Sequence, residues 1–469
     1  MPMEFIVPSV QIDESDVGPR PTAQLSLAAI GIVGTFKKGP LNTVTTIGDA
    51  AALITQFGDY GVGLTGYISS YATLQQGAND LRIVRIAGIG AKSATATLND
   101  GTATPAPSIV VTAINEGTWG NATTVSVINN GTTFDLTAVN GTYSETFKGL
   151  SLTNLTITSK LVMLETAAGA VALPKTTTAA VALTTGSDGA AVADADYIGK
   201  IDSLSGNRSG LSALEPEQVG IVICAQQSSP AMHAALLSFF DGCDIDEGLR
   251  VGILNTAIGK PVDLATAQTT TLDSERGIFA YPWVEPDWLP GVYVAPDGYY
   301  AGRLSYLEPH KSPSNKQIMG ITSCEGTYTY AQVKKLTLAR ISPITLVNGR
   351  GFRIRNGLTL SSDPAWCQTN IRRQQDKMEM ELYRAMQWAI SEPHAEPLWD
   401  AIKTQVDMYL QVQKNLGLIR GYKKTICDKT VNTSEMVTNR ILTTIIRWLP
   451  LYAADFIILR FKREITTDN

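Results

Sequence analysis

The side chains that most often do chemistry in proteins are few in this sequence and lie far apart. It has three histidines, His233, His310 and His394, and none belongs to an HExxH motif or lies near a cysteine. A zinc site needs several such ligands at short, defined spacing, and a serine nucleophile of the hydrolase type needs a GxSxG elbow, which is absent. The sequence therefore predicts no catalytic residue, no metal site and no cofactor.

Two glycine-rich stretches and one acidic cluster also fail the tests for ligand binding. Residues 61–66 fit the GxGxxG pattern, but a dinucleotide fingerprint follows a strand, and here a helical segment precedes it. Residues 34–39 lack the Gly-Lys-Ser/Thr ending of a phosphate-binding loop. Asp244, Asp246 and Glu247 lack calcium-loop spacing, so we interpret them as a solvated turn.

Basic side chains gather toward the end of the chain. From residue 330 onward there are 21 Lys and Arg against 13 Asp and Glu, a net charge of +8, whereas the rest has 17 against 30, a net charge of −13. This asymmetry favours a basic face that meets an acidic partner, although a solvated helix surface explains it equally well. A nucleic-acid interface is opposed by the acidic pI and by carboxylates interspersed on the same predicted helix.

Two amphipathic helices are predicted in the last third. Residues 361–364 (SSDP) begin the first, which runs over 365–390, and residues 392–397 separate it from the second, which ends near Gly417. Apolar residues recur in each at three- and four-residue spacing, and so form one stripe per helix. The stripe residues are Met378, Leu382, Ala385 and Ala389 in the first helix, and Leu398, Ile402, Val406 and Leu410 in the second.

Each end of the chain holds a short alternating run. Val10 and Ile12 alternate with polar residues, and Ile457, Leu459 and Phe461 fall on one side of a predicted half-buried strand. A strand without a neighbouring hairpin partner has to pair with a distant segment or with another chain. A frayed terminus is the alternative for the N-terminal run.

Strands and helices alternate along the chain both before and after residues 91–200. This alternation predicts a parallel sheet with crossover helices. The expected strands are 28–34, 81–86, 219–224, 249–254 and 277–283, and the expected helices are 47–56, 67–76, 230–240 and 263–274. Between residues 91 and 200 the chain is rich in Thr, Val, Asn and Gly, with short runs at 108–113, 123–128, 134–139 and 152–158. Asn130-Gly131 and Asn140-Gly141 predict hairpins there, so we expect an inserted β-rich domain.

The chain has five scattered cysteines and no CxxC pair, which indicates free thiols in a reducing compartment. No secretory signal follows Met1, and Arg447, Pro450 and Asp455 interrupt the apolar stretch 441–459. We therefore expect a protein that is soluble and cytoplasmic when made, without membrane insertion.

Several short blocks follow one another along the chain: 31–34 (GIVG), 38–40 (KGP), 281–284 (YPWV), 313–315 (PSN), 349–357 (GRGFRIRNG), 427–428 (CD) and 455–461 (DFIILRF). Their order and spacing resemble the contractile-tail sheath proteins of bacteriophages and related injection machines. The resemblance covers roughly residues 1–90 and 215–465.

This resemblance implies an α/β (α+β multi-domain) sheath fold in five parts. The expected parts are an N-terminal arm (1–22), an α/β sheath domain (23–90 and 201–335), an inserted β-rich surface domain (91–200), a C-terminal helix-plus-sheet domain (336–450) and a C-terminal arm strand (451–469). Exchange of arm strands between neighbouring subunits is also implied, and its expected residues are Phe5, Val7, Val10, Ile12, Ile457, Leu459 and Phe461.

The implied function is that of a structural, non-enzymatic subunit. Such subunits stack as rings, here expected to be hexameric, around a tail tube protein and contract to drive the tube through a bacterial envelope. Baseplate and tail terminator proteins are the other implied partners, and the virion tail, assembled in the host cytoplasm, is the implied location. We predict that a basic set on the first C-terminal helix faces the tube, and its members are Arg372, Arg373, Lys377 and Arg384.

Three alternatives stay open. The chain fits a sheath-like subunit of a phage-derived bacteriocin or other contractile injection system equally well. The β-rich insertion suggests a surface-display protein or adhesin, which the missing signal peptide opposes. An enzyme built on the α/β sheet is opposed by the absence of a catalytic constellation.

Overall fold

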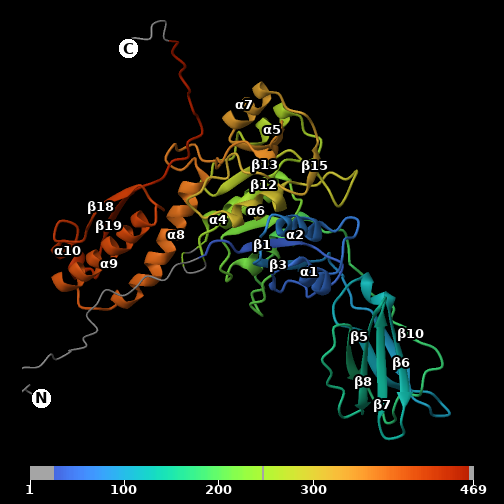
Figure 1. Ribbon diagram of the computed structural model, residues 1–469. Helices are drawn as coiled ribbons and strands as arrows, with labels where there is room; N and C mark the ends of the chain where they lie inside the picture. Colours follow the sequence, from blue (N-terminus) through green and yellow to red (C-terminus); the bar gives the residue numbers. More distant parts are fainter. Residues whose placement is uncertain (1–25, 244, 246–247, 464–469) are drawn as a thin grey trace, which may run out of the picture. The chain divides into compact units, whose positions relative to one another are not determined.

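The computed structural model describes residues 26–243, 245 and 248–463 (Figure 1). These residues divide into two compact units. Residues 26–376 with 453–463 form the first, called here the core unit, and residues 377–452 form the second, called the C-terminal unit. None of the helices in the described ranges combines the length and the apolarity that crossing a bilayer requires.

An eight-stranded sheet organises the core unit. Its strands follow the order β17-β16-β13-β12-β11-β1-β3-β2, in which the six central strands are parallel and the two edge strands run antiparallel to their neighbours (Figure 1). The strands are β1 (Ile30–Thr35), β2 (Thr45–Ile47), β3 (Leu81–Ile86), β11 (Ile221–Cys224), β12 (Val251–Asn255), β13 (Gly277–Tyr281), β16 (Ile341–Val347) and β17 (Gly351–Ile354). The predicted parallel sheet is confirmed.

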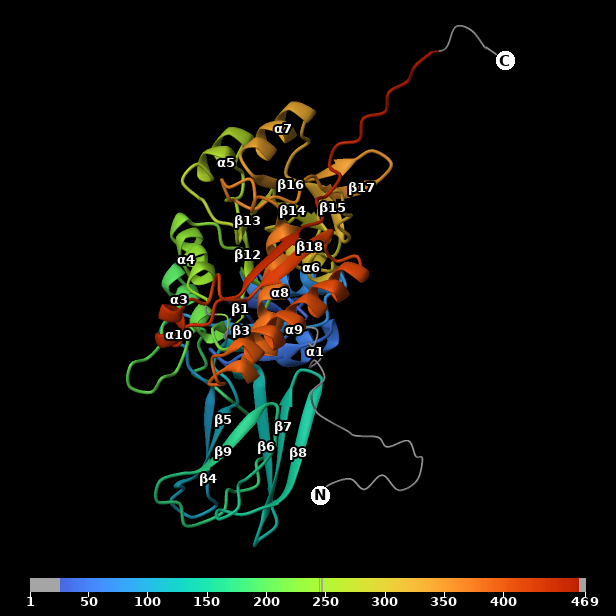
Figure 2. The ribbon, with the colours of Figure 1, turned by 90° about the vertical axis from the view of Figure 1, so that its left-hand side faces the viewer.

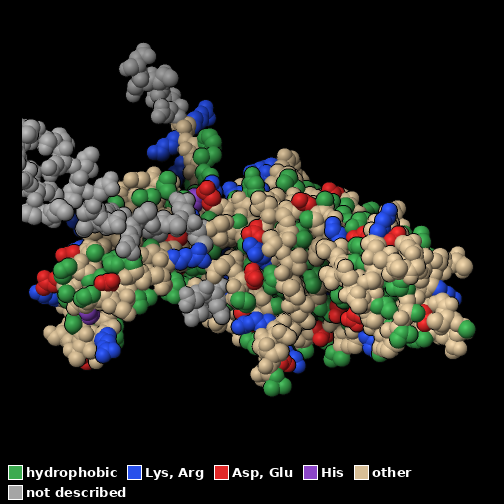
Figure 3. All heavy atoms as spheres, turned by 90° about the horizontal axis from the view of Figure 1, so that it is seen from below, with side chains coloured by type: hydrophobic (Ala, Val, Ile, Leu, Met, Phe, Trp, Pro, Cys, Tyr) green, Lys and Arg blue, Asp and Glu red, His purple; other side chains and the backbone are tan. Residues whose placement is uncertain are grey.

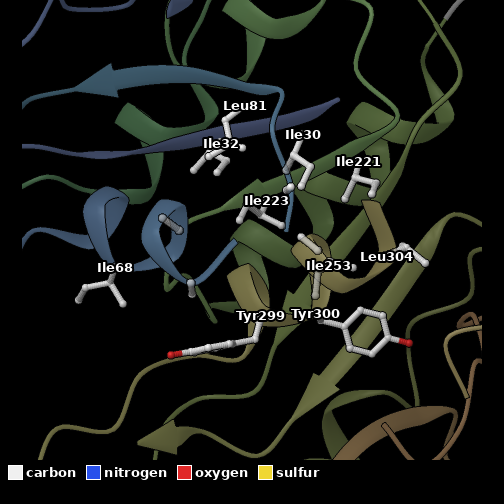
Figure 4. Close-up of a cluster of buried hydrophobic side chains, with 14 of the residues drawn as sticks. Ile30, Ile32, Ile68, Leu81, Ile221, Ile223, Ile253, Tyr299, Tyr300 and Leu304 are labelled. Carbon is white, nitrogen blue, oxygen red and sulfur yellow. The ribbon is translucent and has the colours of Figure 1, made fainter. Parts of the chain in front are cut away.

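The central strands are apolar on both faces, which is why the sheet is covered on both. Ile221 and Ile223 of β11 belong to one hydrophobic cluster, whereas the intervening Val222 and the following Cys224 belong to another. Side chains alternate between the faces of a strand, so the two clusters lie on opposite sides of the sheet. Figure 4 shows side chains of the first cluster, among them Ile30, Ile223 and Ile253 of the strands and Tyr299 and Tyr300 of α6 (Asp297–Tyr306).

Helices from the intervening segments supply the other half of each cluster. Residues of α1 (Ala50–Phe57), α2 (Thr65–Gln75) and α6 (Asp297–Tyr306) contribute to the first cluster, and residues of α3 (Asp194–Ile198), α4 (Pro230–Asp241), α5 (Val262–Gln268) and α7 (Tyr330–Leu338) contribute to the second. Asp49 and Ser229 accept backbone N–H bonds at the starts of α1 and α4, at 2.8 and 3.1 Å.

The helices α2 and α6 approach each other closely through glycine. A methyl group on Gly298 would lie 2.2 Å from the carbonyl oxygen of Ser69, and one on Gly302 would lie 2.5 Å from that of Thr73. The hydroxyl of Thr73 donates to the Gly298 carbonyl oxygen at 3.1 Å. Neither backbone can yield to a side chain at these positions, because each belongs to a hydrogen-bonded helix.

Residues 95–182, between β3 and β11, form a small β-sandwich (Figure 2). One sheet has four strands, β6 (Thr123–Asn129), β7 (Phe134–Asn140), β8 (Tyr143–Leu150) and β10 (Val181–Ala182), and the other has β4 (Thr95–Asn99), β5 (Pro107–Ala113) and β9 (Val162–Thr166). The two sheets share one apolar cluster that includes Val127, Leu136 and Trp119. The insertion therefore has a hydrophobic core of its own.

Both predicted hairpins of the insertion are confirmed, but one predicted strand is wrong. Asn130-Gly131 connects β6 to β7 and Asn140-Gly141 connects β7 to β8, with both glycines at positive φ. No strand forms over 152–158. The tight turn after Asn140 starts the return strand at once, at Tyr143, and a short turn from Ser151 to Asn154 ends it.

The C-terminal unit packs two helices with a two-stranded sheet. Its elements are the end of α8 (Thr369–Met386), the single turn η3 (Gln387–Ala389), α9 (Glu396–Asn415), α10 (Ser434–Thr438), and the antiparallel strands β18 (Gly421–Ile426) and β19 (Ile445–Leu449). Met378 and Leu382 of α8 are buried against all four predicted stripe residues of α9. The predicted helix pair is confirmed.

Two predicted boundaries in this part differ from the structure. The first helix starts at Thr369 and not near residue 364, because the Asp363 side chain accepts from the Ala365 N–H at 2.8 Å and closes a turn, while Thr359 pairs with Cys367. The C-terminal unit starts at residue 377 and not at 336, because β16 and β17 are strands of the large sheet.

We predict that Gly298→Ala destabilises the core unit by about 1–3 kcal/mol, since the added methyl group overpacks the contact between α2 and α6. The measurement is the urea midpoint of the purified full-length chain. Gly48→Ala is the matched control, because the nearest atom to its new methyl group is 3.5 Å away. Equal midpoints for the two variants would contradict the packing argument.

Candidate assembly surfaces

The basic residues at the start of α8 lie inside the core unit. Arg372 is 4% exposed, and its guanidinium group contacts Glu275 Oε1 at 2.7 Å and Asp376 Oδ1 at 2.6 Å. The same group stacks over the Trp366 ring, 4.8 Å from its centroid. Both the charge and the flat face of this arginine are therefore occupied within its own unit.

Asp376 holds two arginines at once. Arg276 donates to both of its carboxylate oxygens at 2.9 Å, and Arg372 Nε donates to Oδ1 at 2.9 Å. Asp376 is 1% exposed. A buried carboxylate flanked by two guanidinium groups ties α8 to the strand that begins at Gly277, because a buried charge is tolerated only with good partners.

Arg373 caps the C-terminal end of another helix, α6. It is 2% exposed, and its Nη1 donates to the carbonyl oxygens of Leu304 and Leu307 at 3.0 and 3.2 Å, at the end of α6. Terminal helix carbonyls lack an intrahelical partner and favour a cation. Burial lowers the pKa of Arg373 to about 10, so the group still carries its charge at neutral pH.

The prediction of a single exposed basic face on this helix is therefore wrong for Arg372 and Arg373. Helical periodicity places both off the apolar stripe, but the first turns of α8 are enclosed on every side by the core unit. Lys377 has 12% of its side chain exposed and lies 3.8 Å from Glu381, whereas Arg384 is exposed. The carboxylate of Asp376, four residues after Arg372, is the sequence signal that reveals this pairing.

The terminal runs differ in what the structure describes. Phe5, Val7, Val10 and Ile12 lie outside the described residues. The other three predicted exchange residues are highly exposed: Ile457 at 80%, Leu459 at 73% and Phe461 at 92%.

This C-terminal run forms no strand in the single chain, so its pairing with a neighbouring subunit stays a prediction. No helix or strand forms between residues 450 and 463, and Phe456 and Ile458, on the opposite side, are 92% and 78% exposed as well. On the face shown in Figure 3, hydrophobic side chains are scattered among polar ones. Five large apolar side chains exposed within six residues, 456–461, therefore mark an interaction segment.

The small sheet of the C-terminal unit is a second candidate surface. Within the described residues it has only β18 and β19, and Ile445, Ile446 and Leu449 are 39%, 37% and 51% exposed. A two-stranded sheet is marginal by itself, and a third strand supplies the missing main-chain hydrogen bonds. Its size and exposure suit it to receive an extended segment.

One further buried carboxylate, that of Asp297, has a structural role. Asp297 is fully buried, and its carboxylate accepts from the Ser69 hydroxyl, the Gln226 and Gly298 N–H groups and the Asn255 amide at 2.6–3.0 Å. Burial raises the pKa of Asp297 despite these donors. The group joins α6 to the ends of β11 and β12, and full burial keeps it from any substrate.

The other candidates for chemistry are separate in space. Among the described residues no three His, Cys, Asp or Glu side chains come close enough to hold a metal ion. His233 is buried, with Nε2 2.8 Å from the Asn255 carbonyl oxygen. Residues 61–66 follow α1 and run into α2, and Asp244, Asp246 and Glu247 lie outside the described residues.

Two family models match consecutive parts of the sequence. The phage tail sheath protein central domain matches residues 190–360, and the phage tail sheath C-terminal domain matches residues 361–462. The chain belongs to the phage tail sheath protein family. The two matches together span more than half of its 469 residues, and they confirm the family predicted from the sequence.

A relative of known name agrees with this family. The tail sheath protein of Enterobacteria phage T4 is 25% identical over 176 residues, which is 37% of this chain. The match spans only 24% of the length of that relative.

Solved structures agree on the fold. A sheath tail protein from Listeria innocua has a TM-score of 0.68 at 16% identity, over 92% of this chain and 96% of its own. The helical sheath of the anti-feeding prophage in its contracted state has a TM-score of 0.60 at 15% identity, over 98% of this chain and 99% of its own. The predicted α/β sheath fold is thereby confirmed.

We predict that Asp376→Asn destabilises the core unit by about 3–5 kcal/mol, because it leaves two buried guanidinium groups without their shared carboxylate. Urea denaturation of the full-length chain measures the loss. Asp263→Asn, which breaks the exposed pair with Lys335, is the control and is expected to cost less than about 1 kcal/mol. A loss as small as that of the control would mean that the buried cluster contributes little.

Proposed function

We propose that this chain is the structural subunit of a contractile sheath, which polymerises as stacked rings around a tail tube and contracts to drive the tube through a bacterial envelope. The observation that carries the proposal is the exposed apolar segment 456–461, which the single chain leaves uncovered. Membership of the sheath family supports it. We expect rings of six subunits, and no enzymatic activity or cofactor.

The exposed segment becomes stable when it adds to a sheet of a neighbouring subunit. Its backbone then gains main-chain hydrogen bonds, and one set of its alternating side chains reaches apolar surface. The sheet of β18 and β19 is the proposed host, since it is narrow and partly apolar on its surface. Ile457, Leu459 and Phe461 are the proposed contact residues, together with Phe5, Val7, Val10 and Ile12 of the N-terminal arm.

Strand exchange suits an assembly that has to change its packing without falling apart. Main-chain hydrogen bonds depend little on the surrounding packing, so subunits can rotate and slide while their arms stay paired. Contacts that do not close on themselves extend such an array along an axis. The subunits then stay connected while the packing between them changes.

Contraction needs no nucleotide in this scheme, because the extended lattice is a metastable state assembled on the tube. Each subunit gains free energy when contraction buries additional apolar area, at about 25 cal/mol per Å². A gain of a few kcal/mol per subunit, added over the whole sheath, drives the tube. Contacts to the tube have to break during firing, so weak surface ion pairs suit them.

The other proposed partners are a tail tube protein, a baseplate and a tail terminator, and the proposed location is a tail particle assembled in the cytoplasm of the host. A phage-derived bacteriocin or other contractile injection system is the second candidate. The fold similarity to the anti-feeding prophage sheath favours it, since that similarity covers 98% of this chain.

The arm prediction is tested by assembly of the full chain in a bacterial cytoplasm, viewed by negative-stain electron microscopy. We expect hollow cylinders from the unaltered chain. We expect only monomers from the triple variant Ile457→Ser, Leu459→Ser, Phe461→Ser and from a chain lacking residues 1–15. Circular dichroism is expected to be unchanged, because the three side chains are exposed in the single chain.

The matched control replaces three exposed apolar residues elsewhere: Val62→Ser, Val171→Ser and Leu204→Ser, which are 92%, 89% and 98% exposed. Cylinders from this control, together with monomers from the arm variant, support strand exchange. Cylinders from the arm variant would overturn the role of the C-terminal arm, and monomers from the unaltered chain would overturn self-assembly.

The tube-facing prediction reduces to a test of Arg384, which remains exposed. We expect Arg384→Glu to weaken binding to co-expressed tube protein about fivefold per contact, as loss of an ion pair of about 1 kcal/mol implies. Co-sedimentation with tubes measures it. Lys414→Glu, an equal charge change at an exposed position of α9, is the control. Equal binding of tube protein by both variants would contradict the proposal that Arg384 contacts the tube.

A further inference from the structure

A hollow in the core unit lies where the inserted β-sandwich meets the large sheet domain. Its volume is about 600 Å³, within the range of sites for small ligands. Lys37, Lys38 and Asp59 line it from the sheet domain, and Tyr143 and Lys160 line it from the insertion. Three lysines from segments more than 100 positions apart therefore meet at one place.

The positive charges in this hollow are incompletely paired. Lys37 Nζ lies 2.9 Å from Asp59 Oδ1, in an exposed ion pair. In the described ranges no carboxylate lies within ion-pair distance of the Lys38 or Lys160 ammonium groups, and only Asp59 among the carboxylates raises the pKa of Lys38. Burial, followed by Lys37 and Lys160, lowers that pKa, so Lys38 is a partly buried cation with two like charges as neighbours.

A second carboxylate near the hollow has another task. Glu145 accepts from the hydroxyl groups of Tyr143 and Ser159, at 2.8 and 2.5 Å, and from the backbone N–H of Lys160 at 3.1 Å. Burial raises the pKa of Glu145, but these donors and the positive charge of Lys160 together lower it below its ordinary value. The carboxylate thus fixes the backbone of Lys160 and the ring of Tyr143 at the rim and forms no ion pair with the Lys160 ammonium group.

We propose that this hollow binds an oxyanion, a phosphate or carboxylate group of a small ligand, between the ammonium groups of Lys38 and Lys160. An oxyanion supplies the acceptors that these two cations lack, and it relieves the repulsion among the three lysines. Asn140, Thr142 and Tyr143 line the same hollow with neutral polar groups that are able to bind the rest of the ligand.

The site also couples two parts of the chain. Lys38 follows the central strand β1, whereas Lys160 precedes β9 of the insertion, so a ligand held by both joins the sandwich to the sheet domain. Binding therefore stabilises the attachment of the insertion as well as neutralising charge. This role is separate from the sheath function proposed above and does not depend on assembly.

Equilibrium dialysis of the full-length chain against radiolabelled inorganic phosphate tests the proposal, because dialysis is insensitive to polymerisation. Ionic strength is held constant with chloride. We expect saturable binding of one phosphate per chain with a Kd of about 1 mM, and at least about tenfold weaker binding by the double variant Lys38→Gln, Lys160→Gln. Competition by unlabelled malonate against unlabelled phosphate distinguishes a carboxylate site from a phosphate site.

The matched control is Lys148→Gln, Lys175→Gln, which removes the same charge from exposed positions of the insertion outside the hollow. Wild-type affinity in this control assigns the binding to the hollow. A thermal melt reports on folding: we expect phosphate at ten times its Kd to raise the Tm of the wild type and of the control by about 2 °C, and that of the hollow variant not at all. Absence of saturable binding, or equal binding by the two double variants, would overturn the proposal.

Discussion

A parallel sheet whose strands are apolar on both faces has to be covered on both, and the rest of this structure depends on that constraint. The alternation of Ile221, Val222, Ile223 and Cys224 between two hydrophobic clusters makes the requirement concrete. Crossover helices meet it, since a parallel connection has to return over a face of the sheet. The close approach of α6 to α2, with no room for a side chain at Gly298, shows how tightly one face is closed.

Buried charged side chains attach α8 to the same sheet. The segment before β13 presents Arg276, and its partner Asp376 comes 100 residues later, on α8. α8 then continues into the C-terminal unit, so one helix serves a polar role at its start and an apolar one at its end. Arg373 at the last carbonyl groups of α6 follows the same logic. The basic character of this stretch is thus partly an internal requirement of the fold, and only partly available to partners.

One segment of the core unit stays largely exposed in the single chain. The segment 456–461 has a composition suited to a sheet interior, and it pairs with no strand within the described chain. An isolated chain of this kind has unsatisfied backbone groups and exposed apolar surface, which association removes. The insertion differs in this respect, since Val127, Leu136 and Trp119 belong to a core of its own. In the proposed assembly, neighbouring subunits complete this segment, whereas the insertion is complete by itself.

The sequence by itself determined the elements whose signal is local. Strand 81–86 agrees with β3 at both ends, the Asn-Gly pairs mark the two hairpins, and the stripe from Leu398 to Leu410 marks α9, because periodicity and turn chemistry depend on neighbouring residues. Block order also identified the family. Only the tertiary structure decided the fate of charged and terminal residues. Arg372 and Arg373 have the same local pattern as surface residues, and their burial depends on Glu275, Asp376 and Leu304, two of them distant in sequence. The alternation at 457–461 likewise predicts a strand, but a strand requires a partner, and no local pattern supplies one. The meeting of Lys38 with Lys160 is a third case, since only the packing of the insertion on the sheet domain brings them together.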